Sequence, residues 1–263
     1  MHALQGCDGS VLIDSTANNT AEKDAVPNNP SLRGFEVIDA AKTAIEARCP
    51  KTVSCADILA FAARDSVALA SGNSSNLTYK VPAGRRDGRV SRDTDANSNL
   101  PSPLSSAAEL VGNFTRKNLT AEDMVVLSGA HTVGRSHCSS FVPDRLAVPS
   151  DINAGFANFL RRRCPANPAP AAANDPTVNQ DIVTPNALDN QYYKNVLAHK
   201  VLFTSDAALL TAPATAKMVG DNANIPGWWE GKFKKSFVKM SQIEVKTRNQ
   251  GEIRKYCRAV NTK

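Results

Sequence analysis

The stretch from residue 120 to residue 134, TAEDMVVLSGAHTVG, decides how this chain is expected to fold. Thr120 belongs to a residue type that caps helices, and two acidic residues follow it in what would be the first helical turn. The apolar run MVVL predicts a helix, and the small residues SGA end it. His131 comes next, where small neighbours would let a bulky planar group approach the backbone. By spacing alone, a structural histidine at a helix end is the more common interpretation, and a haem ligand is the alternative.

Helical spacing of apolar residues recurs on both sides of this stretch, and strand patterns are nearly absent. The other predicted helices lie within residues 31–48, 54–70, 104–117, 151–164, 188–200, 205–222 and 226–240. We expect the helix at 54–70 to be buried, because it is apolar on nearly all faces, and we expect residues 76–99 to be irregular. The sequence therefore predicts a mainly α fold, and its length of 263 residues fits one domain or two.

Two charged residues, Asp57 and Arg64, interrupt the apolar helix at 54–70. A buried charge needs a partner, and the turn Arg85-Arg86-Asp87 contains side chains of both signs that could supply one. The alternative is that both charges lie at the edges of the helix.

The composition excludes several classes of protein. The most apolar segment, residues 58–63, is bounded by charges on both sides, so no membrane-spanning helix is expected. No repeat with a period of tens of residues is present, which excludes a solenoid. The net charge of +6 favours polyanionic surroundings. We expect no nucleic-acid binding, because the basic clusters lack interleaved aromatic residues.

Six cysteines without a C-x-x-C pair favour disulfides over a zinc site. Glycosylation sequons of the type N-x-S/T favour the same oxidising compartment, and they occur at Asn18, Asn73, Asn76, Asn113 and Asn118. The first residues, MHALQGC, do not have the basic and apolar regions of a signal peptide.

Two further segments are rich in oxygen-bearing side chains, GCDGS at residues 6–10 and DIVTPNALD at residues 181–189. Calcium prefers carboxylate, hydroxyl and carbonyl oxygens of this kind. Each segment could equally be an Asx or Ser/Thr turn that binds nothing.

A series of short motifs stands in the order found in secreted class III plant peroxidases. These motifs are GCDGSVL at 6–12, EKD at 22–24, LRGF at 32–35, VSCAD at 53–57, GRRD at 84–87, LSGAHT at 127–132, TP at 184–185, DNQYY at 189–193 and GEIR at 251–254. The chain resembles this family from Leu4 to Asn261. The resemblance implies one haem-peroxidase domain over residues 1–263, with haem b between distal and proximal helical halves. It also implies hydrogen peroxide and small phenols as substrates, and a monomer in the apoplast, cell wall or vacuole.

The resemblance assigns roles to four residues around the haem. His131 would be the axial ligand of the haem iron, and the Asp206 carboxylate would bind its other ring nitrogen. Pro101 matches a proline that contacts the substrate, and Asn28 matches an asparagine that orients the distal histidine.

The resemblance also implies two calcium sites and two disulfides. The distal calcium site would be incomplete, and it would keep Leu4, Gly6, Asp8, Ser10 and, through water, Glu22. The proximal calcium site would consist of Thr132, Asp181, Thr184, Ala187 and Asp189. The disulfides would join Cys55 to Cys257 and Cys138 to Cys164, which leaves Cys7 and Cys49 without their usual partners.

The chain departs from the family pattern at its start, because the distal histidine and arginine would fall before residue 1. We therefore expect a peroxidase truncated at its N-terminus, with impaired turnover in this chain, since the missing pair performs acid-base and electrostatic catalysis. His2 is out of register by two positions for the distal role. The alternative is a catalytically silent basic glycoprotein that binds calcium and haem and associates with wall polyanions such as pectate.

Overall fold

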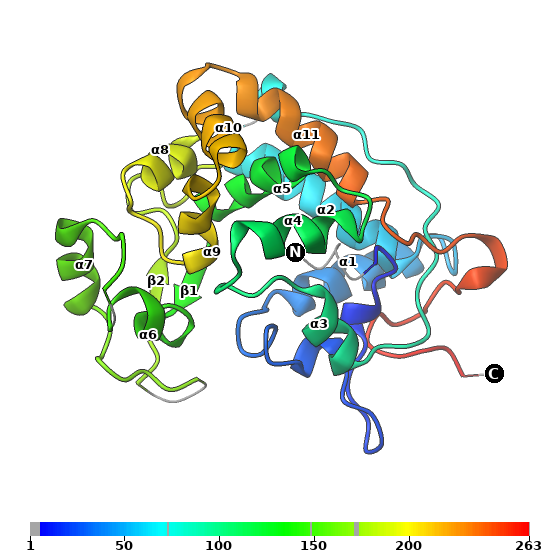
Figure 1. The fold of residues 1–263 in the computed structure, drawn as a ribbon. Coiled ribbons are helices and arrows are strands. Elements are labelled where there is room, and N and C mark those ends of the chain that lie inside the picture. Colours follow the sequence, from blue (N-terminus) through cyan, green and yellow to red (C-terminus); the bar gives the residue numbers. More distant parts are fainter. Residues whose placement is uncertain (1–5, 73, 148, 171–173, 263) are drawn as a thin grey trace. The chain divides into compact units, whose positions relative to one another are not determined.

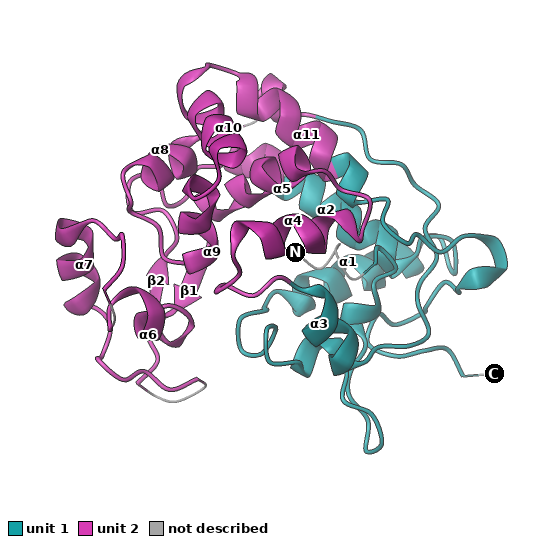
Figure 2. Cartoon of the chain, in the orientation of Figure 1, with its two compact units in different colours: residues 1–66, 79–100, 238–263 teal, residues 67–78, 101–237 magenta. Residues whose placement is uncertain are grey.

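A computed structural model describes residues 6–72, 74–147, 149–170 and 174–262, and these are mainly helical, as the sequence predicts (Figure 1). Leu4, an expected calcium ligand, lies outside the described residues. The chain divides into two compact units (Figure 2). Unit 1 comprises residues 1–66, 79–100 and 238–263, and unit 2 comprises residues 67–78 and 101–237. No helix of the described part is both long and apolar enough to cross a bilayer.

Unit 1 is built around two longer helices and several short turns. Its elements are α1 (Phe35–Glu46), the first part of α2 (Cys55–Ala70), α3 (Asp93–Asn99), the end of α11 (Trp228–Met240) and the 3-10 turns Ser10–Leu12, Glu22–Asp24 and Arg248–Gln250. Helix α2 starts as expected, because Ser54 Oγ accepts a hydrogen bond from the Asp57 backbone N–H at 3.0 Å. The core of this unit joins the two helices to the N-terminal turn through Val11, Leu12, Ile38, Cys55, Ile58 and Cys257.

The prediction of a buried ion pair in unit 1 is confirmed for Asp57. Arg85 Nη1 lies 3.0 Å from Asp57 Oδ1, and both side chains are buried. The Gly84 backbone N–H also donates to Asp57 Oδ2 at 2.7 Å. Arg64 follows the alternative instead, since it is partly exposed and pairs with its neighbour Asp65. The buried carboxylate thus has charge and hydrogen-bond partners, as burial requires.

Two expectations about this region are wrong. Helix α2 is buried only in its first turn and at Val67, and Leu69 is 72% exposed, so its apolar second half is not enclosed by the described residues. Residues 93–99 form helix α3, although the surrounding segment was expected to be irregular. Asp93 and Asp95 in its first turn favour the helix, because acidic side chains stabilise the positive end of the helix dipole.

Unit 2 contains most of the helices and the only two strands of the described part. Its elements are α4 (Ala107–Thr115), α5 (Ala121–Ser128), β1 (Arg135–His137), α6 (Val142–Arg145), α7 (Ala154–Arg161), β2 (Thr177–Asn179), α8 (Gln191–Leu197), α9 (Thr204–Ala207), α10 (Pro213–Asn224) and most of α11. Helix α10 packs against α8 and α5, and α4 packs against α5 (Figure 1). Strands β1 and β2 pair antiparallel, with Ser136 opposite Val178.

Helix α5 is central to unit 2, and the sequence places its start correctly. Thr120 Oγ1 accepts from the Asp123 backbone N–H at 3.0 Å, and Asp123 Oδ2 accepts from the Thr120 backbone N–H at 2.8 Å. This reciprocal capping box satisfies two N–H groups that a helix start leaves without helical partners. The helix ends at Ser128 and continues as the 3-10 turn Gly129–Thr132, which carries His131.

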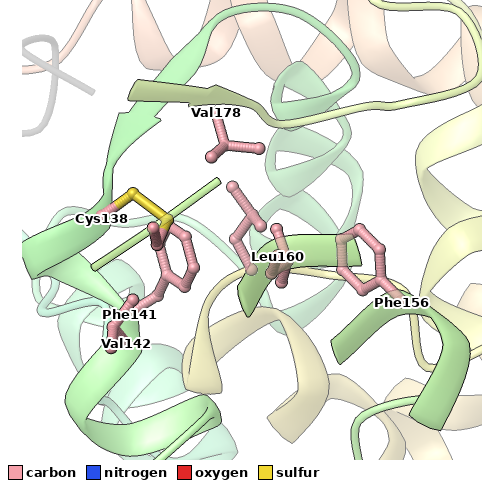
Figure 3. Close-up of a cluster of buried hydrophobic side chains, with 8 residues drawn as sticks. Cys138, Phe141, Val142, Phe156, Leu160 and Val178 are labelled. Carbon is pink, nitrogen blue, oxygen red and sulfur yellow. A yellow bond between two sulfur atoms is a disulfide. The ribbon is translucent and has the colours of Figure 1, made fainter. Parts of the chain in front are cut away.

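A separate apolar cluster in unit 2 holds β2 and α7 together (Figure 3). Its buried members are Cys138, Phe141, Val142, Phe156, Leu160, Cys164, Val178 and Leu202. The disulfide between Cys138 and Cys164 lies inside this cluster and closes the loop that carries α6 and α7.

Candidate functional site

His131 and Asp206 lie side by side in unit 2, although 75 residues separate them in sequence. His131 Nδ1 is 2.9 Å from Asp206 Oδ1, and Asp206 is buried at the start of helix α9. A carboxylate only accepts hydrogen bonds, so Nδ1 is the donor of this bond, and in the neutral imidazole Nε2 then keeps its lone pair. The imidazole is 19% exposed, so it is not fully enclosed by the described residues. This arrangement fits a histidine that binds a metal through Nε2.

Aromatic rings fix the orientation of the His131 imidazole. The Phe203 ring meets it edge-on with a centroid separation of 5.5 Å, and the Tyr192 ring does so at 6.0 Å. The Tyr192 hydroxyl donates to Asp206 Oδ1 at 2.7 Å. Burial beside the Asp206 carboxylate holds the pKa of Tyr192 well above its usual value, so the hydroxyl stays protonated.

The backbone that carries His131 is packed against α8 and α11. The Tyr193 hydroxyl donates to the carbonyls of Val125 and Val126 at 2.9 and 3.0 Å. Trp229 Nε1 donates to the Val126 carbonyl at 3.1 Å. Both side chains are buried, and their bonds satisfy carbonyls near the end of α5.

The expected substrate-contacting residue, Pro101, lies on a loop of the same unit. Two residues further on, the Pro103 carbonyl accepts from the Ser205 backbone N–H at 2.8 Å. This bond ties the loop to helix α9, next to Asp206 in the chain. Pro101 itself is partly exposed.

Five oxygen atoms converge next to His131, and all come from the residues expected to bind the proximal calcium. Thr132 Oγ1 lies 3.5 Å from Asp181 Oδ2, 3.4 Å from the Ala187 carbonyl and 3.1 Å from Asp189 Oδ1. Thr184 Oγ1 lies 3.3 Å from the same Asp181 oxygen and 3.2 Å from the same Asp189 oxygen. Two carboxylates share this small space with hydroxyl and carbonyl groups. Such a set of hard oxygens matches the ligands that calcium prefers.

The cluster contains only two acidic side chains. Within the described ranges, no group of three or more His, Cys, Asp or Glu side chains is arranged to hold a metal ion. The other oxygens of the cluster therefore belong to hydroxyl and carbonyl groups. Such oxygens are typical ligands of calcium and not of zinc. The Asp181 carboxylate is further held by the Val183 and Thr184 backbone N–H groups at 2.6 and 3.1 Å.

Three of the residues expected at the distal calcium site, Asp8, Ser10 and Glu22, lie close together in unit 1. Asp8, Ser10 and Glu22 are all buried. Burial raises the pKa of Glu22 to about 7, although the Ser10 hydroxyl opposes this shift and the Asp8 carboxylate adds to it. Lys246 Nζ lies 3.3 Å from Asp8 Oδ2. A cationic side chain thus already contacts one of the expected ligands.

Gly6 and Asn28 complete the described part of this distal region. Gly6 has a φ of 138° and is partly exposed. The Asn28 side chain donates through Nδ2 to the Glu22 carbonyl at 2.6 Å and is buried. Asn28 is therefore fixed to the turn that carries Glu22.

Both disulfides implied by the resemblance are formed. Cys55 is bonded to Cys257 in unit 1, and Cys138 is bonded to Cys164 in unit 2. Cys7 and Cys49 form no disulfide. Cys7 Sγ lies 3.2 Å from the Met240 carbonyl, and burial raises the pKa of this thiol to about 11.

Sequence reasoning missed the part that Tyr192 plays beside Asp206. The signal in the sequence is the motif DNQYY at residues 189–193, which the resemblance links to the family and, through Asp189, to the proximal calcium site. In helix α8 the two tyrosines point in different directions, so Tyr192 reaches Asp206 and Tyr193 reaches the end of α5.

Comparison with known proteins identifies the family of the chain. The family model described as "Peroxidase" matches residues 2–224. The chain is 60% identical over 259 residues to "Peroxidase 2" of Zea mays, covering 98% of this chain and 76% of that protein. It is 48% identical over 266 residues to "Peroxidase 5" of Vitis vinifera, covering 98% of this chain and 78% of that protein. "Peroxidase 1" of Zea mays is 48% identical over 268 residues, which cover 98% of this chain and 71% of that protein.

The family match includes helix α5 and the turn that carries His131 and extends past Asp206, and the similarity to the plant proteins runs through almost the whole chain. The chain belongs to the plant class III peroxidase family, whose members are oxidoreductases that use hydrogen peroxide.

Proposed function

We propose that this protein binds haem b through His131 Nε2 and oxidises small phenols with hydrogen peroxide. The observation that carries the proposal is the bond between His131 Nδ1 and Asp206 Oδ1, 2.9 Å long and buried on the Asp206 side. A carboxylate that accepts a hydrogen bond from Nδ1–H makes the imidazole a stronger electron donor to a metal bound at Nε2. The ring edges of Phe203 and Tyr192 keep the imidazole from rotating.

The residues present fit a haem iron. The His131 Nδ1–H donates to Asp206 Oδ1, so Nε2 is the ring nitrogen left for a ligand, and the imidazole is partly exposed. When bound, haem supplies the iron at which one hydrogen peroxide is reduced to two waters while two phenols each lose one electron and one proton. The protein residues would hold and orient this group, and we propose that Pro101 contacts the phenol.

We further propose that the five converging oxygens of the proximal cluster bind calcium. Thr132 adjoins His131, so an ion at this position would tie the ligand histidine to the loop at residues 181–189. For the distal site we propose the same ion with Leu4, Gly6, Asp8, Ser10 and Glu22 as ligands. Calcium binding there would have to displace Lys246 from Asp8.

The family match supports the organisation of the chain as one peroxidase domain, since it runs through residues of both compact units. We propose that the protein acts as a monomer outside the cell, in the apoplast or cell wall, or in the vacuole. The net charge of +6 supports an association with wall polyanions such as pectate.

Haemin titration of the refolded protein in the presence of calcium tests the proposal. We expect one haem per chain, with a histidine-ligated Soret spectrum that His131→Ala abolishes. His137→Ala is the matched control, because His137 Nδ1 also lies beside an aspartate, 3.4 Å from Asp175 Oδ2, and is 23% exposed. An unchanged spectrum in His131→Ala would disprove the assignment.

Guaiacol oxidation by hydrogen peroxide then separates the two candidate functions. Turnover that requires His131, even at the impaired rate expected from the sequence, would support the peroxidase. A histidine-ligated spectrum without turnover would support the silent calcium- and haem-binding glycoprotein.

A further inference from the structure

Two hydrogen-bond donors share one oxygen of Asp206. His131 Nδ1 lies 2.9 Å from Asp206 Oδ1, and the Tyr192 hydroxyl lies 2.7 Å from the same atom. The other carboxylate oxygen, Oδ2, is buried and has no hydrogen-bond partner among the described residues. The charge of Asp206 is therefore divided between the imidazole and the phenol.

We propose that Tyr192 is a positioning residue that limits how strongly Asp206 draws on the Nδ1 proton of His131. A hydroxyl that donates to a carboxylate oxygen stabilises its negative charge and weakens that oxygen as an acceptor for a second donor. Tyr192 thus moderates the anionic character of His131. Where His131 binds haem iron, which rests on the function proposed above, Tyr192 also moderates electron donation to the iron.

Burial makes this effect specific to Tyr192. The side chains of Tyr192 and Asp206 are both buried, so bulk water does not compensate for a lost hydroxyl. The rings of His131 and Tyr192 are nearly perpendicular, at 80°, so the phenol acts on the imidazole through the shared oxygen and not by stacking. In a buried site of low dielectric constant, a change in one hydrogen bond alters its neighbour more than it would in water.

The chain offers a matched control in the next residue. Tyr193 is also buried, and its ring contacts that of Tyr192 with a centroid separation of 5.0 Å. Its hydroxyl donates to the carbonyls of Val125 and Val126 and not to a carboxylate. Tyr193→Phe therefore removes a buried hydroxyl from the same helix without changing the charge on Asp206.

The first measurement uses the haem-free protein. The resonance of the His131 Nδ1 proton reports the strength of its bond to Asp206, and we expect Tyr192→Phe to move it downfield, because Asp206 becomes the stronger acceptor. Tyr193→Phe should leave it in place. A fluorinated tyrosine at position 192, which is a stronger donor, should move it upfield.

The second measurement uses the haem-loaded protein. Tyr192→Phe should lower the ferric/ferrous reduction potential and raise the iron–histidine stretching frequency, and the fluorinated tyrosine should do the opposite. The proposal is overturned if Tyr192→Phe and Tyr193→Phe give the same proton resonance, potential and frequency. Failure of haem ligation by His131 would overturn the proposed function alone, since the proton resonance of the haem-free protein still decides the role of Tyr192.

Discussion

At the scale of single residues, Gly129 shows how little space surrounds the 3-10 turn Gly129–Thr132 that carries His131. A Cβ at this position would lie 2.5 Å from Trp229 Nε1 and 2.6 Å from the Tyr193 hydroxyl. Both groups are fixed by their bonds to the end of α5, so neither can move aside without losing a buried hydrogen bond. The glycine is needed here for close approach and not for an unusual backbone angle, because its φ is −57°.

We expect Gly129→Ala to lower the free energy of unfolding by about 1–3 kcal/mol, as overpacking in a core does. Chemical denaturation of the variant measures this loss. The same variant should weaken haemin binding, because the displaced turn carries His131.

Gly112→Ala is the control for this prediction. Gly112 lies within α4, and apart from its chain neighbours and its own helix backbone no described atom lies within 4 Å of the position that its Cβ would occupy. Alanine there should stabilise the protein by about 0.5–1 kcal/mol, because glycine is a poor residue for a helix interior. Equal effects of the two substitutions would show that the space around Gly129 does not matter.

At the scale of elements, helix α5 joins local sequence signals to the site. Its capping box is formed by Thr120 and Asp123, and its last residue lies three positions before His131. Asp123 also accepts from the Ser236 hydroxyl through Oδ1 at 2.7 Å, so the helix start is tied to α11. A change at the cap therefore acts on helix α5, which leads directly into the turn that carries His131.

Thr120→Ala should destabilise the protein by about 1 kcal/mol, since a side-chain cap is lost and a backbone N–H is left without that acceptor. Thermal or urea unfolding checks this value. Thr120→Ser keeps a capping hydroxyl and should stay close to the parent protein. A similar loss in both variants would mean that packing of the threonine methyl group, and not the cap, stabilises this end.

At the scale of the whole molecule, calcium should couple the loop at residues 181–189 to the stability of the fold. An ion that binds only the folded state adds about 2.7 kcal/mol when its concentration is 100 times its Kd. We expect added calcium to raise the melting temperature and a chelator to lower it.

Asp189→Asn should abolish most of this calcium-dependent shift, because it removes one of the two carboxylates of the proximal cluster. Asp221→Asn is the control, since Asp221 pairs with Lys217 on the surface of α10. A full calcium response in Asp189→Asn would contradict the proposed proximal site, and the remaining response would then belong to the distal one.

Several elements of this fold could be predicted because their signals are local. The cap at Thr120 and the apolar run of α5 involve residues only a few positions apart. The ion pair of Asp57 could be predicted because a buried charge needs a partner. The extent of burial of α2 could not be predicted. An apolar helix is covered only as far as other segments pack on it, and Leu69 remains exposed.

The sequence by itself determined the helical class, the peroxidase family and the identity of His131 and Asp206 as partners, because ordered motifs and helix signals are properties of the chain. Only the tertiary structure decided that Tyr192 shares an Asp206 oxygen with His131 and that Lys246 contacts Asp8. These relations depend on side-chain direction and packing between distant segments. Residue spacing specifies neither the direction of a side chain nor the packing of distant segments. A contact between side chains from distant segments is therefore known only from the folded structure.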